Sequence, residues 1–226
     1  MGYLTKQVFG EVTGAVGHVV FKHRAGSNYI SMRVDKLKAS LDPAVLARRA
    51  KFALTGKIAQ AVNSLPVLKA AWPATTGKLS RFNEIFQANY KIIGSVDNIL
   101  AVTVAPVFGF NLANSLVTTL ASGVQLTTDA LGVKIGVDTG IEKYITAAGV
   151  VVLSDPTQEG LPATLVLPFK SPQQNLDLIN PIDITAEFEG TALVEYGFYT
   201  TKQAFVCLVT LDDNSQTVHA SLSVQS

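Results

Sequence analysis

The sequence predicts an α+β protein in three parts: an N-terminal β or extended arm (residues 1–40), a small helical part (41–94) and a C-terminal antiparallel β-sandwich of immunoglobulin-like architecture (95–226). Three patterns support this division. Glycine-spaced β-branched and aromatic residues fill the arm, apolar residues recur every three or four positions in the helical part, and period-two alternation dominates after residue 95. At 226 residues the chain can bury a sizeable core.

The arm contains short β-like segments, such as 16–21 and 29–34, with glycines between them. A segment with so many glycines can form only a small hydrophobic core. We therefore expect the arm to pack on a larger part of the protein or on a partner. Its basic residues could contact nucleic acid or an acidic neighbour: Lys22, Arg24, Arg33, Lys36 and Lys38. We favour the acidic neighbour because the second half of the same sequence supplies one.

The helical part opens with a predicted helix over residues 42–65, in which Asp42 is a suitable N-cap and Pro43 a suitable first residue. One apolar stripe follows helical spacing: Leu46, Ala50, Leu54, Ile58, Ala61 and Leu65. A solvated helix needs only one such stripe, yet this helix carries a second. We therefore predict an assembly interface, covered by another copy or by the arm, at Val45, Arg48, Arg49, Phe52 and Ala59.

Two shorter helices are expected after this one. The first runs from residue 64 to Trp72, and the second opens near Thr75 and ends at Gly94. The second has an apolar stripe at helical spacing: Leu79, Phe82, Phe86, Tyr90 and Ile93.

The β-rich part reads as short strands about ten residues apart, a spacing typical of an antiparallel sandwich. The expected strands are 100–105, 123–127, 132–137, 149–153, 163–169, 182–188, 192–199, 204–211 and 217–224. The uncharged stretch 98–128 is long enough to cross a bilayer, but its proline, its asparagines and a strand-like segment favour a buried β region. We expect no signal peptide and no membrane partner.

Charge is distributed unevenly along the chain. The net charge is only +1, yet residues 1–94 hold 14 Lys and Arg against 4 Asp and Glu, whereas residues 95–226 hold 4 against 13. The two stretches therefore carry +10 and −9. Such an asymmetry points to a polyanion or to a second copy that presents its opposite half.

No motif of the sequence indicates catalysis or a cofactor. The histidines are His18, His23 and His219, and the first two have no carboxylate pair close in sequence. Four acidic residues could bind calcium, but alternation with apolar residues favours a solvated sheet face: Asp183, Glu187, Glu189 and Glu195. Cys207 is the single cysteine, and its apolar neighbours predict a buried strand residue. We expect no cofactor, no metal and no enzymatic activity.

The N-terminal half resembles an uncharacterised family of Bacteroidota and their mobile elements, including phages. The resemblance lies in MGYLTKQVFGEVTGAVGHVVFK, in YISMR at 29–33 and in LARRAKF at 46–52. It implies a glycine-spaced N-terminal β arm, then a helix of R-x-K-F type, then a β-rich half. The family has no established activity, so the resemblance implies no site residues.

These observations predict a non-enzymatic structural protein that assembles as a repeated subunit of a larger particle. Our first choice is a bacteriophage virion component, capsid- or tail-associated, found in the virion or in the bacterial cytoplasm before assembly. Its partners would be copies of itself, as a homo-oligomer, and other particle proteins. The alternative is a surface or carbohydrate binding module acting through the sandwich loops.

Overall fold

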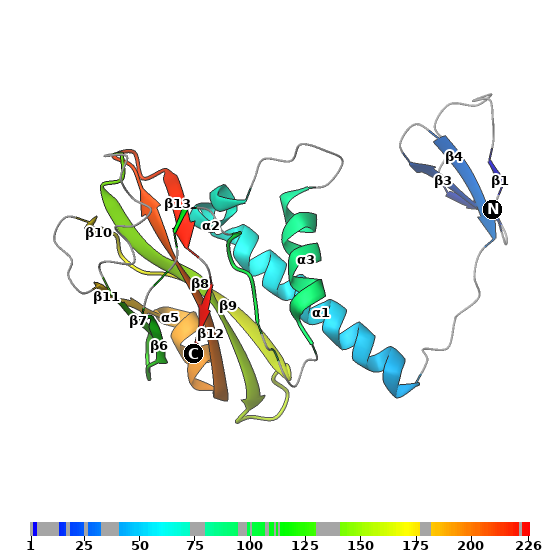
Figure 1. Ribbon diagram of the computed structural model, residues 1–226. Helices are drawn as coiled ribbons and strands as arrows, with labels where there is room; N and C mark the ends of the chain where they lie inside the picture. Colours follow the sequence, from blue (N-terminus) through cyan, green and yellow to red (C-terminus); the bar gives the residue numbers. More distant parts are fainter. Residues whose placement is uncertain are drawn as a thin grey trace. The chain divides into compact units, whose positions relative to one another are not determined.

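A computed structural model of the chain describes residues 2–3, 14–16, 19–24, 27–32, 41–72, 80–94, 99, 101–106, 109–110, 112, 114–129, 141–176, 182–221 and 223–226. The chain divides into two compact units, Met1–Val45 and Leu46–Ser226. Helices and mostly antiparallel sheets make up the described residues (Figure 1), which confirms the predicted α+β class.

The first unit holds a sheet with the strand order β1-β4-β3-β2, in which every pairing is antiparallel. Its strands are β1 (Gly2–Tyr3), β2 (Gly14–Val16), β3 (Val19–Arg24) and β4 (Ser27–Met32). The predicted β character of the arm is therefore confirmed where the structure describes it.

The register of this sheet gathers apolar residues on one face. Phe21 is paired with Ile30, Val19 with Met32, and Val16 with Val19. Directly paired residues project from the same side of a sheet, so these five form one surface, here called the arm face. No described side chain of this sheet is buried. Val16 and Met32 are 72% and 77% exposed.

Helix α1 (Pro43–Ser64) begins as predicted. The Ala44 backbone N–H donates a hydrogen bond of 2.9 Å to Oδ1 of Asp42, and proline occupies the first helical position, where its missing N–H is not needed. Helix α2 (Pro66–Ala71) follows after Leu65.

Helix α3 (Arg81–Ile92) starts at the N-cap Ser80, whose hydroxyl accepts from the Asn83 N–H. The predicted start near Thr75 lies outside the described residues. The buried side chains of α3 are Ile85 and Asn89, joined by Ile93 just beyond its end. The helix is therefore buried along a face next to its predicted aromatic stripe.

The larger unit is built on a sheet in which two strands of 13 residues, β8 (Tyr144–Pro156) and β12 (Tyr199–Leu211), pair along their length. The sheet, here called the central sheet, follows the order β10-β8-β12-β13-β5, with β9 also paired to β8 and β14 to β12. The other strands are β5 (Gly109–Phe110), β9 (Thr164–Lys170), β10 (Gln174–Asn175), β13 (Thr217–Ser221) and β14 (Val224–Gln225).

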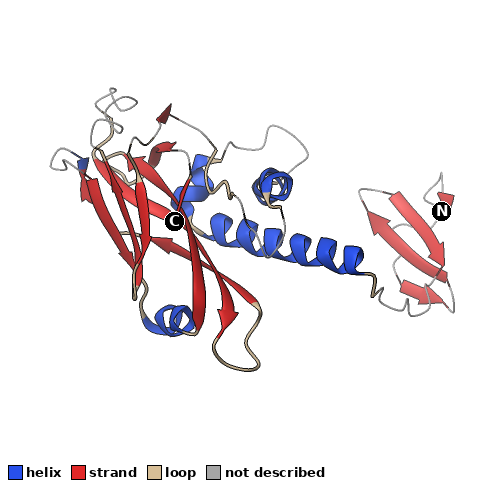
Figure 2. Ribbon diagram, turned by 60° about the horizontal axis from the view of Figure 1, so that its bottom comes forward, coloured by secondary structure: helices blue, strands red, loops and turns tan. Residues whose placement is uncertain are grey.

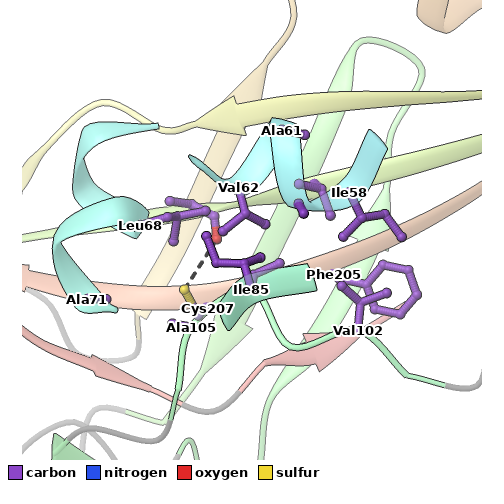
Figure 3. Close-up of a cluster of buried hydrophobic side chains, with 14 of the residues drawn as sticks. Ile58, Ala61, Val62, Leu68, Ala71, Ile85, Val102, Ala105, Phe205 and Cys207 are labelled. Atoms are coloured by element: carbon purple, nitrogen blue, oxygen red, sulfur yellow. Dashed lines mark hydrogen bonds between the residues drawn. The ribbon is translucent and has the colours of Figure 1, made fainter. Parts of the chain in front are cut away.

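Both faces of the central sheet are covered. On one face Val150 and Cys207 pack in a cluster with Ile58 and Leu68 from the helices (Figure 3). On the other face Val151 and alternate residues of β12 pack in a second cluster with a smaller sheet. A strand buried on both faces reads as an unbroken apolar run, and the sequences of β8 and β12 show this pattern.

The smaller sheet has the order β11-β7-β6, with β6 (Leu116–Thr119), β7 (Gly123–Thr128) and β11 (Ile182–Glu187) all antiparallel. Two sheets therefore pack face to face in this part of the chain. Because the helices share the first cluster with the central sheet, the predicted boundary at residues 94/95 does not separate two compact units.

The predicted strand 192–199 is wrong: Gly190–Gly197 forms helix α5 (Figure 2). Ala192 and Tyr196, four residues apart, turn inward, and the Tyr196 hydroxyl donates to the carbonyls of Leu120 and Gly123 at 2.9 and 3.0 Å. Burial raises the pKa of Tyr196, so the phenol stays a donor. A spacing of four residues places Ala192 and Tyr196 on the same side of either a strand or a helix. The hydrogen bonds of the Tyr196 hydroxyl favour the helix.

The predicted strand 100–105 is also wrong, because side chains and not a neighbouring strand satisfy its backbone. Asn89 Nδ2 donates to the Thr103 carbonyl at 3.0 Å, and Asn89 Oδ1 accepts from the Thr103 N–H at 2.9 Å. Trp72 Nε1 donates to the Val104 carbonyl at 3.1 Å, and the Val104 N–H donates to Ser223 Oγ at 2.9 Å. Asn89 thus imitates one step of a β-ladder.

The closest approach of the two long strands gives a test of the fold. A Cβ placed on Gly149 would lie 2.0 Å from the Phe205 carbonyl oxygen, so Gly149→Ala must push β8 and β12 apart. We expect a loss of about 1–3 kcal/mol in the free energy of unfolding, measured by urea titration of the far-UV circular dichroism.

Gly56→Ala is the matched control. Gly56 lies inside α1 with nothing within 4 Å of an added Cβ, so this change should stabilise the helix by about 0.5–1 kcal/mol. If Gly149→Ala and Gly56→Ala had the same free energy of unfolding, β8 and β12 would not be held as close together at Gly149 as described here.

Candidate assembly interface

The first half of α1, residues 43–53, carries apolar side chains without a core of its own. Residues 41–53 include no buried residue, whereas the second half of the helix buries Leu54, Ile58 and Val62 in the first cluster. Leu46 is 44% exposed and Phe52 is 59% exposed. In Figures 1 and 2 this half of the helix extends past α3.

The predicted interface is only partly at the surface. Arg48 and Arg49 are exposed, Phe52 is exposed and Val45 is half-buried. Ala59 is fully buried in the cluster between the helices and the central sheet, so its assignment to an interface is wrong. The second stripe runs the length of α1, and the fold of the same chain covers its C-terminal end.

Phe52 also has a partner in its own chain. Its ring centroid lies 4.8 Å from that of Phe86 and 6.4 Å from that of Tyr90, both on α3. Phe86 in turn stacks on Tyr90, and Lys51 Nζ lies 4.7 Å from the Tyr90 centroid. The aromatic stripe predicted for α3 therefore packs beside α1 and leaves more than half of Phe52 exposed.

The structure describes two residues of the predicted basic arm. Lys22 is exposed on β3, and Arg24 is the last residue of that strand. Arg33, Lys36 and Lys38 lie outside the described residues.

Helix α5 supplies an exposed apolar surface that the sequence analysis missed. Leu193 and Val194 are 37% and 54% exposed. Glu189 just before the helix, Glu195 within it and Glu187 at the end of β11 are exposed as well. The spacing of Gly190, Leu193, Val194 and Gly197 is that of one helical face, a signal that the strand assignment concealed.

A hollow of about 490 Å³ lies between β9 and β11. Its two aromatic rings, Phe169 and Phe188, are buried and stand 6.1 Å apart. Its charged lining residues are Lys170, Glu187 and Glu189. Since neither ring is exposed, the hollow offers no flat aromatic surface on which a sugar could stack.

Acidic residues and histidines do not converge on a metal site within the described residues. Asp183 and Glu187 are exposed on alternate positions of β11, as the solvated-face reading predicts. His219 Nδ1 lies 2.7 Å from Oε1 of Glu142, whose side chain is buried. This pair joins β13 to the segment before β8. Also among the described residues, no helix is long and apolar enough to cross a bilayer.

The chain matches no family model, and no curated protein matches it in sequence.

Cys207, predicted to be a buried strand residue, is fully buried in β12 and donates to the Ala148 carbonyl at 3.5 Å. Burial raises the pKa of its thiol from 9.0 to about 12. We expect the native protein at pH 8 to resist a thiol-specific reagent that modifies the urea-unfolded chain at once, because the thiolate is the reactive form.

The same shift predicts the direction of a pH effect on stability. The Cys207 thiol ionises near pH 9 in the unfolded chain and near pH 12 in the folded chain. The stability that the buried neutral thiol contributes is therefore fully present below pH 9 and is lost as the pH rises toward 12. The Cys207→Ala variant has no thiol to ionise, so its free energy of unfolding should fall less than that of wild type between pH 9 and pH 12. Modification of the native thiol as fast as that of the unfolded chain would contradict the buried placement.

Proposed function

We propose that the chain is a non-enzymatic structural protein that works as a repeated subunit of a larger assembly. A bacteriophage virion is the assembly we favour, with the chain associated with its capsid or tail. The resemblance of the N-terminal half to a family of Bacteroidota and their phages supports this source, and the protein would be found in the virion or in the bacterial cytoplasm before assembly.

The observation that carries the proposal is apolar surface left uncovered in both units. The arm face exposes Val16 and Met32, and the first half of α1 exposes Leu46 and Phe52. A small sheet needs a covered apolar face for independent stability, and a helix of about three turns is marginal alone in water. Both surfaces are therefore suited to burial against a partner.

Copies of the same chain are the partners that composition favours. Only 15% of the residues are charged, which is low for a monomer with its whole surface in water. The charges of residues 1–94 and 95–226 are opposite, so one copy offers what another lacks. Other particle proteins could use the same surfaces.

The alternative of a surface or carbohydrate binding module depends on the β-rich part. An immunoglobulin-like architecture would present loops at its ends, and we retain that architecture as a proposal on the ground that two sheets pack around one cluster. The buried rings of the hollow between β9 and β11 do not favour a sugar site, so we rank this function second.

Self-association should depend on the first half of α1. We expect the full chain to form oligomers in sedimentation velocity, and Leu46→Glu to weaken them at least tenfold, because a carboxylate would enter an apolar contact. Leu46 is preferred to Phe52 because Phe52 also packs on Phe86. Gln60→Glu, at an exposed position in the second half of α1, is the matched control. A wild-type chain that stays monomeric at high concentration would overturn the proposal.

Removal of the arm should affect assembly and leave the larger unit folded. Deleting residues 2–34 removes the arm face but none of the residues of the two clusters. We expect an unchanged thermal midpoint for the larger unit, together with fewer or smaller oligomers. Normal assembly of the truncated chain would show that the arm has no part in it.

Nucleic acid is the second-choice partner. Binding to a random oligonucleotide would fall steeply and log-linearly with salt, as counterions are released. Tight binding of this kind without protein oligomers would replace the proposed function by nucleic-acid binding.

A further inference from the structure

We infer that the first half of α1 in one copy packs against α5 in the next copy, so that the subunits associate head to tail. This inference rests on the proposed function and names the two surfaces that would meet. Each is an exposed apolar helical surface bordered by charge, and the charges are of opposite sign.

The α1 surface combines apolar side chains with arginines. Leu46 and Phe52 are exposed, and Arg48 and Arg49 between them are exposed too. Residues 43–53 contain Arg48, Arg49 and Lys51 and no acidic residue. A second surface that offers apolar area and negative charge would complement this one.

The α5 surface meets both requirements. Leu193 and Val194 stand on its outer side between Gly190 and Gly197, and an added Cβ at either glycine would meet nothing within 4 Å. Glycines without neighbours leave room for a second helix to approach closely. The exposed charged residues within α5 and next to it in sequence are acidic: Glu187, Glu189 and Glu195.

The two surfaces cannot meet within one copy. Leu54 and Ile58 fix α1 in the cluster on one face of the central sheet, whereas Tyr196 fixes α5 in the cluster on the other face (Figure 2). Contact between them must join different copies. The patches differ, so the contact is heterologous, and repetition produces a ring or an open filament.

Charge argues against two other occupants of the α1 surface. The chain's own arm, residues 1–40, carries six Lys and Arg against two Asp and Glu, so it is positive like α1. A second α1 would bring arginines against arginines. Like charges across a contact disfavour it, and the acidic α5 surface is the complement that this sequence provides.

A charge-reversal exchange tests the inference in the full-length chain. One variant carries Arg48→Glu and Arg49→Glu, a second carries Glu189→Lys and Glu195→Lys, and a third carries all four changes. Sedimentation velocity measures association, and circular dichroism checks that these exposed substitutions leave the fold intact. We expect each two-site variant to lose association at least tenfold, because each places like charges together.

The decisive result is recovery. The four-site variant again has opposite charges at the four exchanged positions, so its association should return to within about threefold of wild type. An equimolar mixture of the two defective variants should associate for the same reason. Lys69→Glu with Lys91→Glu and Glu159→Lys with Asp213→Lys, all at exposed positions elsewhere, are the matched controls and should associate as wild type does.

The outcomes separate this inference from the proposed function. A wild-type chain that never self-associates overturns both. A wild-type chain that associates while the two-site variants are unaffected, or while the four-site variant stays as defective as they are, overturns only the pairing of α1 with α5. A defect in the control variants equal to that of the test variants would reduce the effect to net charge and would also overturn the pairing.

Discussion

The larger unit depends on the pairing of β8 with β12. This pairing extends from Tyr199 opposite Pro156 to Leu211 opposite Tyr144, and both faces of the pair are buried from Ala204 to Leu211 of β12 and from Ile145 to Leu153 of β8. Each strand therefore supplies apolar residues to two clusters at once, one shared with the helices and one with the smaller sheet. The helices and the smaller sheet therefore both pack against this pair of strands.

Because both faces of the sheet are buried, backbone N–H and C=O groups need other hydrogen-bond partners at positions where no neighbouring strand is paired. Serine hydroxyls fulfil this role repeatedly at the sheet margins. Ser171 Oγ accepts from the Ala147 N–H at 2.9 Å, Ser221 Oγ from the Leu208 N–H at 2.9 Å, and Ser226 Oγ from the Ala204 N–H at 3.0 Å. A buried N–H without a partner would cost several kcal/mol, so these short side chains matter to the stability of the sheet.

The sequence was most informative where local chemistry decides the structure. Asp42 and Pro43 identify the start of α1, and the apolar run around Cys207 identifies a buried strand. The sequence was misleading where contacts between residues far apart in the chain determine the structure. Residues 192–199 fit a strand or a helix, and the hydrogen bonds of Tyr196 to the carbonyls of Leu120 and Gly123 select the helix. No local pattern states that Asn89 would stand in for a neighbouring strand.

The candidate interface shows the same division. Helical periodicity located two apolar stripes on α1, but it could not tell which half of the helix the central sheet covers. Ala59 and Phe52 occupy the same stripe, and only Ala59 reaches the core. The α5 surface was missed because its residues were assigned to a strand, which places Leu193 and Val194 on opposite faces, whereas a helix places them together.

The distribution of charge links the fold to assembly. A net charge of +1 would give copies little overall repulsion, and the separation into +10 and −9 would let opposite charges of two copies attract each other locally. Within the larger unit, the helices lie on one face of the central sheet, whereas β11 and α5 belong to the cluster on the other face. The head-to-tail contact proposed above would join these two faces in different copies, and the exposed apolar residues of α1 and α5 would maintain it when salt screens the charges.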